Sequence, residues 1–113
     1  MHEISLCEDV VQLIEAQAGV QGFRRVRTVR LEIGSLAGVE IEAMRFGFDA
    51  VARGSIADGA SLEIIEVPGT AWCPHCRKQV GVELRFDACP DCGHQPLQLT
   101  AGDEMRILEL EVE

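Results

Sequence analysis

The sequence predicts an α+β fold: a small three-stranded sheet with two helices on one face, and a metal-binding insert between the last two strands. Three observations support this prediction. Apolar residues recur at helical spacing in two segments and suit strands in three others. Two C-x-x-C pairs lie together between the last two strand-like segments. The length of 113 residues supports one modest core, so we expect one main domain with a small module.

The first helix is predicted over residues 5–19. Ser5 fits an N-cap, and Glu8 three residues later completes a capping box. Gly19 favours the end of the helix. The apolar stripe of the helix consists of Leu6, Val10, Leu13 and Ile14. Residues 1–4 are therefore expected at the entrance of the helix.

Strands and a second helix follow. Residues 29–33 alternate between apolar and polar side chains, which is typical of a half-buried strand, and Gly34 ends it. Residues 41–53 have an apolar face at helical spacing. Residues 60–67 and 105–112 favour strands. Because these two strands flank the cysteines, we expect one hairpin whose ladder leaves the sheet at the insert and then resumes.

The insert forms a separate module in this prediction. We expect an α/β domain made of residues 1–67 and 96–113, and a metal module made of residues 68–95. The module has two knuckles, Cys73-Pro74-His75-Cys76 and Cys89-Pro90-Asp91-Cys92. Each knuckle directs two sulfurs at one point, and two knuckles complete a tetrahedron suited to Zn²⁺. Four protein ligands leave no open position, so the sequence predicts a structural zinc-ribbon-like site.

Two other chemistries also fit the four cysteines. A pair of disulfides is the first, although paired cysteines in a chain without a visible secretory signal favour metal binding. An iron–tetrathiolate electron-transfer site of rubredoxin type is the second, and its visible absorbance would distinguish it from zinc. His75 and His94 flank the cysteines. They either face solvent or bond a ligand sulfur, or they tune the zinc site by sensing pH or replacing a thiolate.

The N-terminal residues Met1, His2 and Glu3 form a second candidate metal site. The Met1 amine, the His2 amide and imidazole, and the Glu3 amide can close fused chelate rings around one ion. Nitrogen donors in a plane suit Ni(II) or Cu(II). A lone histidine near a terminus is also commonly just an exposed residue. Cys7 is expected to be a small buried hydrophobe, with an extra soft ligand near this site as the alternative.

Composition excludes several classes of function. The net charge of −9 and pI of about 4.7 disfavour a nucleic-acid binder, which needs a basic face. No apolar run approaches the roughly 20 residues of a membrane span. The cysteine usage suits a reducing compartment, so we expect a cytoplasmic protein. We find no Ser–His–Asp set and no phosphate loop, and therefore do not expect an enzyme.

Five segments together resemble one known family. They are Met1-His2-Glu3, Ile33-Gly34-Ser35-Leu36, Phe46-Gly47-Phe48, the two cysteine knuckles with Gly93, and Gly102-Asp103-Glu104-Met105-Arg106-Ile107. In this order along the whole chain, they resemble the HypA/HybF family of hydrogenase maturation factors, which are nickel metallochaperones.

The resemblance implies specific roles. Nickel would bind at Met1, His2 and Glu3, while structural zinc would be held by Cys73, Cys76, Cys89 and Cys92. The carrier would deliver nickel to the large subunit of [NiFe]-hydrogenase in partnership with the HypB GTPase. An exposed sheet edge leaves a homodimer open. The competing hypotheses are a zinc-ribbon interaction module without metal transport and a rubredoxin-like electron carrier.

Overall fold

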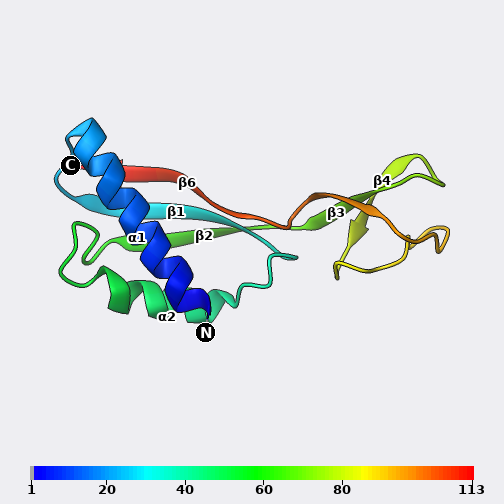
Figure 1. The fold of residues 1–113 in the computed structure, drawn as a ribbon, viewed down its shortest axis with the longest axis horizontal. Helices are drawn as coiled ribbons and strands as arrows, with labels where there is room; N and C mark the ends of the chain where they lie inside the picture. Colours follow the sequence, from blue (N-terminus) through cyan, green and yellow to red (C-terminus); the bar gives the residue numbers. More distant parts are fainter. Residues whose placement is uncertain (1) are drawn as a thin grey trace. The chain divides into compact units, whose positions relative to one another are not determined.

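The structure is a computed structural model that describes residues 2–113. Within these residues the chain forms two helices and six strands (Figure 1). In chain order the elements are α1 (His2–Gln21), β1 (Val26–Gly34), α2 (Ile41–Ala52), β2 (Ser61–Val67), β3 (Gly69–Cys73), β4 (Lys78–Val82), β5 (Gln98–Ala101) and β6 (Met105–Val112). The predicted α+β fold class is confirmed.

The strands form two separate three-stranded sheets. The first has the order β2-β1-β6, and the second has the order β4-β3-β5 with antiparallel pairing on both sides of β3. The first sheet with the two helices matches the prediction. The second sheet was not predicted, because its strands are only four or five residues long and carry no sustained apolar alternation.

The chain divides into two compact units. The first contains residues 1–31, 39–64 and 107–113, and the second contains residues 32–38 and 65–106. The second unit extends on both sides of the predicted module 68–95. The assignment of nickel to one domain and zinc to the other stays a prediction.

Helix α1 begins at His2, three residues earlier than the predicted N-cap at Ser5, and ends at Gln21 instead of Gly19. The capping-box prediction is wrong because Ser5 lies inside the helix. The end is set by Gly22, whose φ of 81° is easily adopted by glycine. The Gly22 amide donates to the Ala18 carbonyl at 2.8 Å, which satisfies one of the last free acceptors of the helix.

The helices pack on each other through small and apolar side chains. The buried residues are Cys7, Val10, Val11 and Ile14 from α1 and Met44, Phe48 and Ala52 from α2. Gly47 permits the close approach, since a Cβ there would lie 2.9 Å from the Ile4 Cδ1 atom and 3.3 Å from the Cys7 sulfur. Cys7 is fully buried, as expected. Leu13 was predicted in the stripe but is 56% exposed.

Strand β1 is the central strand of the first sheet, which overturns the predicted hairpin. Its position between β2 and β6 means that the strands flanking the insert are not neighbours. Val29, Leu31 and Ile33 are at most 1% exposed, and the centre of a sheet is where a strand this apolar buries most surface. On the other side of the strand, Arg30 bonds one carboxylate of β2 and two of β6 at 2.8–2.9 Å, from Glu63, Glu109 and Glu111.

Three glycines of the second unit meet without room for a side chain. A Cβ on Gly34 would lie 2.1 Å from the carbonyl carbon of Gly102, and one on Gly102 would lie 2.6 Å from the Cα of Gly69. A Cβ on Gly69 would lie 2.7 Å from Leu36. The Leu36 amide donates to the Gly102 carbonyl at 2.7 Å, so the segments are also tied by hydrogen bonds.

Substituting Gly34 with alanine should therefore cost about 3 kcal/mol of unfolding free energy or more, because the added Cβ meets backbone atoms that cannot rotate away. Gly19→Ala is the matched control. A Cβ at Gly19 meets nothing within 4 Å in an α-helix, so this change should gain roughly 1 kcal/mol. Denaturant melts measure both, and a Gly34→Ala protein as stable as the parent would contradict the close contact.

Replacing Arg30 by glutamine should lower the melting temperature in a pH-dependent way. Hydrogen bonds from Arg30 and then Thr28 hold the pKa of Glu111 below its ordinary value of 4.5. A carboxylate with a depressed folded pKa stabilises the protein above its unfolded pKa, and that contribution is lost as the pH falls through the folded pKa.

The difference between Arg30→Gln and the parent should thus be large near pH 7 and small near pH 3. Thermal melts across this range test it. Arg53→Gln is the control, because Arg53 and Asp49 form an exposed pair at 3.7 Å, which contributes little. A difference that does not change with pH would show that Arg30 acts through packing and not through its charge.

Candidate metal centre

The first knuckle lies at the tip of the β3–β4 hairpin. Cys73 ends β3 and is paired in register with Lys78, the first residue of β4. Between them the Arg77 amide donates to the Cys73 carbonyl at 2.7 Å, and the Cys76 amide donates to the Cys73 sulfur at 3.3 Å. Arg77 has a φ of 57°, a left-handed conformation that closes the turn.

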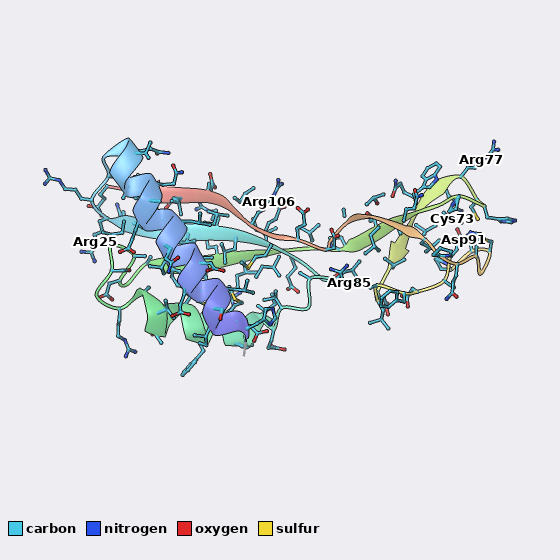
Figure 2. The ribbon with its side chains drawn as sticks, viewed as in Figure 1. Arg25, Cys73, Arg77, Arg85, Asp91 and Arg106 are labelled. Atoms are coloured by element: carbon cyan, nitrogen blue, oxygen red, sulfur yellow. The ribbon has the colours of Figure 1, made fainter. Side chains whose placement is uncertain are left out.

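The second knuckle repeats this turn. The Gly93 amide donates to the Cys89 carbonyl at 2.8 Å, and Gly93 has a φ of 77°. Gly93 therefore occupies the position that Arg77 occupies in the first knuckle, four residues after the leading cysteine. Lys78 forms an ion pair with Asp91 and links the two knuckles. Figure 2 shows Cys73, Arg77 and Asp91 close together in this part of the second unit.

The structure brings the four predicted cysteines together. All four sulfurs lie within 4.8 Å of one another, and no disulfide joins them. The Cys73 and Cys92 sulfurs are 3.7 Å apart, and those of Cys76 and Cys89 are 3.9 Å apart. Zinc–sulfur bonds of about 2.3 Å in a tetrahedron place the sulfurs about 3.8 Å apart. The four side chains therefore fit one tetrahedral thiophilic ion.

Among the clustered thiols, the pKa values of Cys76 and Cys89 differ from their ordinary values in a way that favours binding of a cation. A hydrogen bond with the Cys92 sulfur, together with burial, raises the pKa of Cys76 to about 12. Burial also opposes ionisation of Cys89, but hydrogen bonds from the backbone amides of Asp91 and Cys92 bring its pKa down to about 7. One thiolate thus forms readily and its neighbour does not. A divalent ion among the sulfurs removes this conflict.

A small core supports the site on one side. Cys73 and Cys89 are at most 3% exposed, whereas Cys92 lies at the surface. The supporting apolar residues are Leu36, Ala71, Val80, Val82, Leu97 and Leu99. Leu84 and Phe86 lie in the same segment of the chain but are 69% and 90% exposed, so they do not belong to this core. Leu36 was missed because it comes from a segment more than thirty residues away.

His75 and His94 meet beside the thiols, one from each knuckle. Their ring centroids are 5.8 Å apart, and the ring planes are inclined by 14°, which is a stacked arrangement. The sequence placed each histidine next to its own knuckle, but no sequence signal predicted that the rings would contact each other.

At the other candidate site the structure describes His2 and Glu3, while Met1 lies outside the described residues. The His2 Nδ1 atom is 3.5 Å from a Glu3 carboxylate oxygen. The same oxygen accepts a hydrogen bond from the Glu40 amide at 3.2 Å. The hydrogen bond from the Glu40 amide helps to lower the pKa of Glu3 to about 2. Glu3 is therefore a buried, ionised anchor beside an exposed histidine.

Helical geometry also affects the backbone nitrogens of this site. His2 and Glu3 lie in the first turn of α1, where an amide has no carbonyl acceptor within the helix. These amides are therefore not needed for the helical hydrogen bonds. Cys7 lies one turn further along, but it is fully buried and its thiol points to the Met44 carbonyl at 3.5 Å.

No helix among residues 2–113 is long and apolar enough to cross a membrane.

Comparison with known proteins identifies the family. The family profile described as "Hydrogenase/urease nickel incorporation, metallochaperone, hypA" matches residues 1–112. The chain belongs to the HypA family. The hydrogenase maturation factors HypA of Alkalilimnicola ehrlichii and Azotobacter vinelandii are 59% and 58% identical to it, over 100% of both chains in each case. This family consists of nickel-incorporation metallochaperones.

A solved structure shares the HypA fold. The solution structure of the Ni metallochaperone HypA from Helicobacter pylori superimposes with a TM-score of 0.74 at 24% identity, covering 99% of this chain and 97% of that one. The overall fold of the helices and the two sheets is thus a property of known HypA proteins.

The thiol geometry predicts that metal binding releases protons. Adding Zn²⁺ to metal-free protein near pH 7 should release roughly three to four protons per ion, because most of the thiols are protonated before the ion binds. A weakly buffered titration with a pH indicator measures the number. Cys92→Ser should lower it by about one. Release of no protons would mean that the thiols do not act as the ligands.

Proposed function

We propose that this chain binds Ni(II) at its N-terminus and delivers it to the large subunit of [NiFe]-hydrogenase. The observation that carries the proposal is membership of a nickel-incorporation metallochaperone family, combined with an exposed His2 at the first turn of a helix. The imidazole, two backbone amides and the Met1 amine supply nitrogen donors in sequence. An ion held by such an open set can be released to a partner.

The local chemistry decides how nickel would be held. The positive end of the α1 dipole opposes a bound cation. Two features offset this repulsion: amides that lose their protons on binding become negative, and the ionised Glu3 carboxylate lies 3.5 Å from the His2 ring. Deprotonated amides and an imidazole favour square-planar Ni(II). Because protons leave as nickel binds, affinity should rise with pH.

The four cysteines are proposed to hold a structural Zn²⁺. Four thiolates fill the tetrahedral positions and leave none for substrate or water, so the ion folds the second unit and does no chemistry. His75 and His94 are proposed to tune this site through their stacked rings. Repeating the Zn²⁺ titration with His75→Ala/His94→Ala tests this role, and an unchanged affinity and proton count would overturn it.

We also propose that the protein is a carrier without enzymatic activity, and we propose its partner and compartment. The family profile names nickel incorporation and not a catalysed reaction, which supports a carrier without enzymatic activity. Nickel transfer is proposed to involve the HypB GTPase. Five free cysteines suit the reducing cytoplasm, which is where we place the protein.

A nickel titration tests the site directly. Three zinc-loaded proteins should be compared: the parent, His2→Ala, and a chain with one glycine added before Met1. The extension keeps every side chain but moves the α-amine away from the His2 amide. We expect one equivalent of Ni²⁺ with roughly micromolar affinity in the parent and loss of binding in both variants.

The outcomes separate the competing functions. Equal binding by all three proteins would move nickel elsewhere on the chain, and no binding by any of them would favour a zinc-stabilised interaction module. Strong visible absorbance of the purified protein would favour a rubredoxin-like iron centre. His2→Gln provides a matched control, since it keeps a polar side chain of similar size but lacks the imidazole.

A further inference from the structure

Two adjacent arginines of the first unit have no ionic partner within residues 2–113. They are Arg24 and Arg25, and both are exposed. The other arginines of this unit each lie 2.8–3.7 Å from a carboxylate, in the pairs Arg27–Glu113, Arg30–Glu63, Arg45–Glu42 and Arg53–Asp49. Acidic residues outnumber basic ones by 19 to 10, so two neighbouring unpaired arginines are unexpected.

These arginines line a cleft of about 640 Å³ together with Glu15 and the loop at residues 54–59. The Arg25 guanidinium lies over this loop, with its Nη2 atom 4.0 Å from the place of a Cβ on Gly59. A second hollow of about 380 Å³ shares Arg25 and Gly59 and adds Arg27 together with its ionic partner Glu113. Arg25, which is labelled in Figure 2, therefore lines both hollows.

The acidic groups of the cleft limit what it can bind. Asp58 is occupied, because its carboxylate accepts a hydrogen bond from the Gly54 amide at 3.0 Å. Glu15 lines the same cleft and would repel a compact dianion such as phosphate. An extended acidic segment carries single carboxylates that are spaced along the chain. Each carboxylate can form a bidentate pair with one guanidinium group while it stays away from Glu15.

We propose that Arg24, Arg25 and Arg27, the basic edge, bind an extended acidic segment of a partner protein. The occupant is chosen by charge complementarity: the unpaired guanidinium groups of Arg24 and Arg25 lie beside two adjoining hollows, and the acidic groups there disfavour a single dianion. The proposal is independent of the nickel site, because none of its residues belongs to the N-terminal donors.

Binding of a fluorescent polyglutamate peptide, followed by anisotropy, tests the basic edge. We expect the parent to bind the peptide at low salt and to bind it more weakly at about 0.15 M salt. Arg24→Gln/Arg25→Gln should weaken binding roughly tenfold, since two exposed charge contacts are lost. Arg24→Lys/Arg25→Lys should retain part of it. The matched control, Arg53→Gln, removes an equally exposed but paired arginine and should bind like the parent.

Three results would overturn the proposal: no peptide binding by the parent, equal losses in the double variant and Arg53→Gln, or displacement of the peptide by inorganic phosphate at comparable concentration. Sedimentation velocity of the parent and the double variant tests whether a second copy of this chain binds there instead. A parent dimer that the double variant dissociates would be a fourth overturning result, because it would assign the basic edge to a second copy of this chain. Thermal melts equal to the parent's establish that each variant is folded.

Discussion

The second unit depends on a steric constraint, the meeting of Gly34, Gly69 and Gly102. Each glycine lies where a Cβ would approach backbone or side-chain atoms to 2.7 Å or less. The three come from separate parts of the chain: the end of β1, the start of β3, and the turn between β5 and β6. Because these segments touch backbone to backbone, Leu36 can enter the small core that supports Cys73 and Cys89. The absence of three side chains thus allows the packing of Leu36 beside the cysteines.

The two candidate metal sites use opposite physical designs. The cysteines form a closed set with partly buried sulfurs, in which the pKa of Cys76 is raised and that of Cys89 is lowered. At the other candidate site, His2 is exposed at the start of α1, and the Glu3 carboxylate accepts a hydrogen bond from the Glu40 amide. A closed thiolate set holds an ion for the lifetime of the fold, whereas labile nitrogen donors exchange it. The separation of structural support from transport that we propose rests on this difference.

Local patterns predicted much of the fold and grouped the right cysteines, because helices, strands and C-x-x-C turns are encoded within a few residues. Long-range contacts were not predictable in this way. Nothing near Glu3 indicates that Glu40 would bond its carboxylate, and the stacking of His75 on His94 depends on how two knuckles meet. The hairpin prediction was wrong for the same reason. Strand order depends on which strand buries most surface, and the apolar β1 is the central strand of the first sheet.

The placement of charges links the stability of the first sheet to the surface of the first unit. Arg30 joins three strands by holding one carboxylate of β2 and two of β6, so the open side of the sheet tolerates three acidic groups. That arginine and three others are paired with neighbouring carboxylates, so among residues 2–113 the arginines of the first unit without an ionic partner are Arg24 and Arg25. An acidic protein has little reason to leave guanidinium groups unpaired beside a cleft when its own carboxylates are in excess. The pairing that stabilises the sheet is thus also what makes the basic edge distinctive as a surface for an acidic partner.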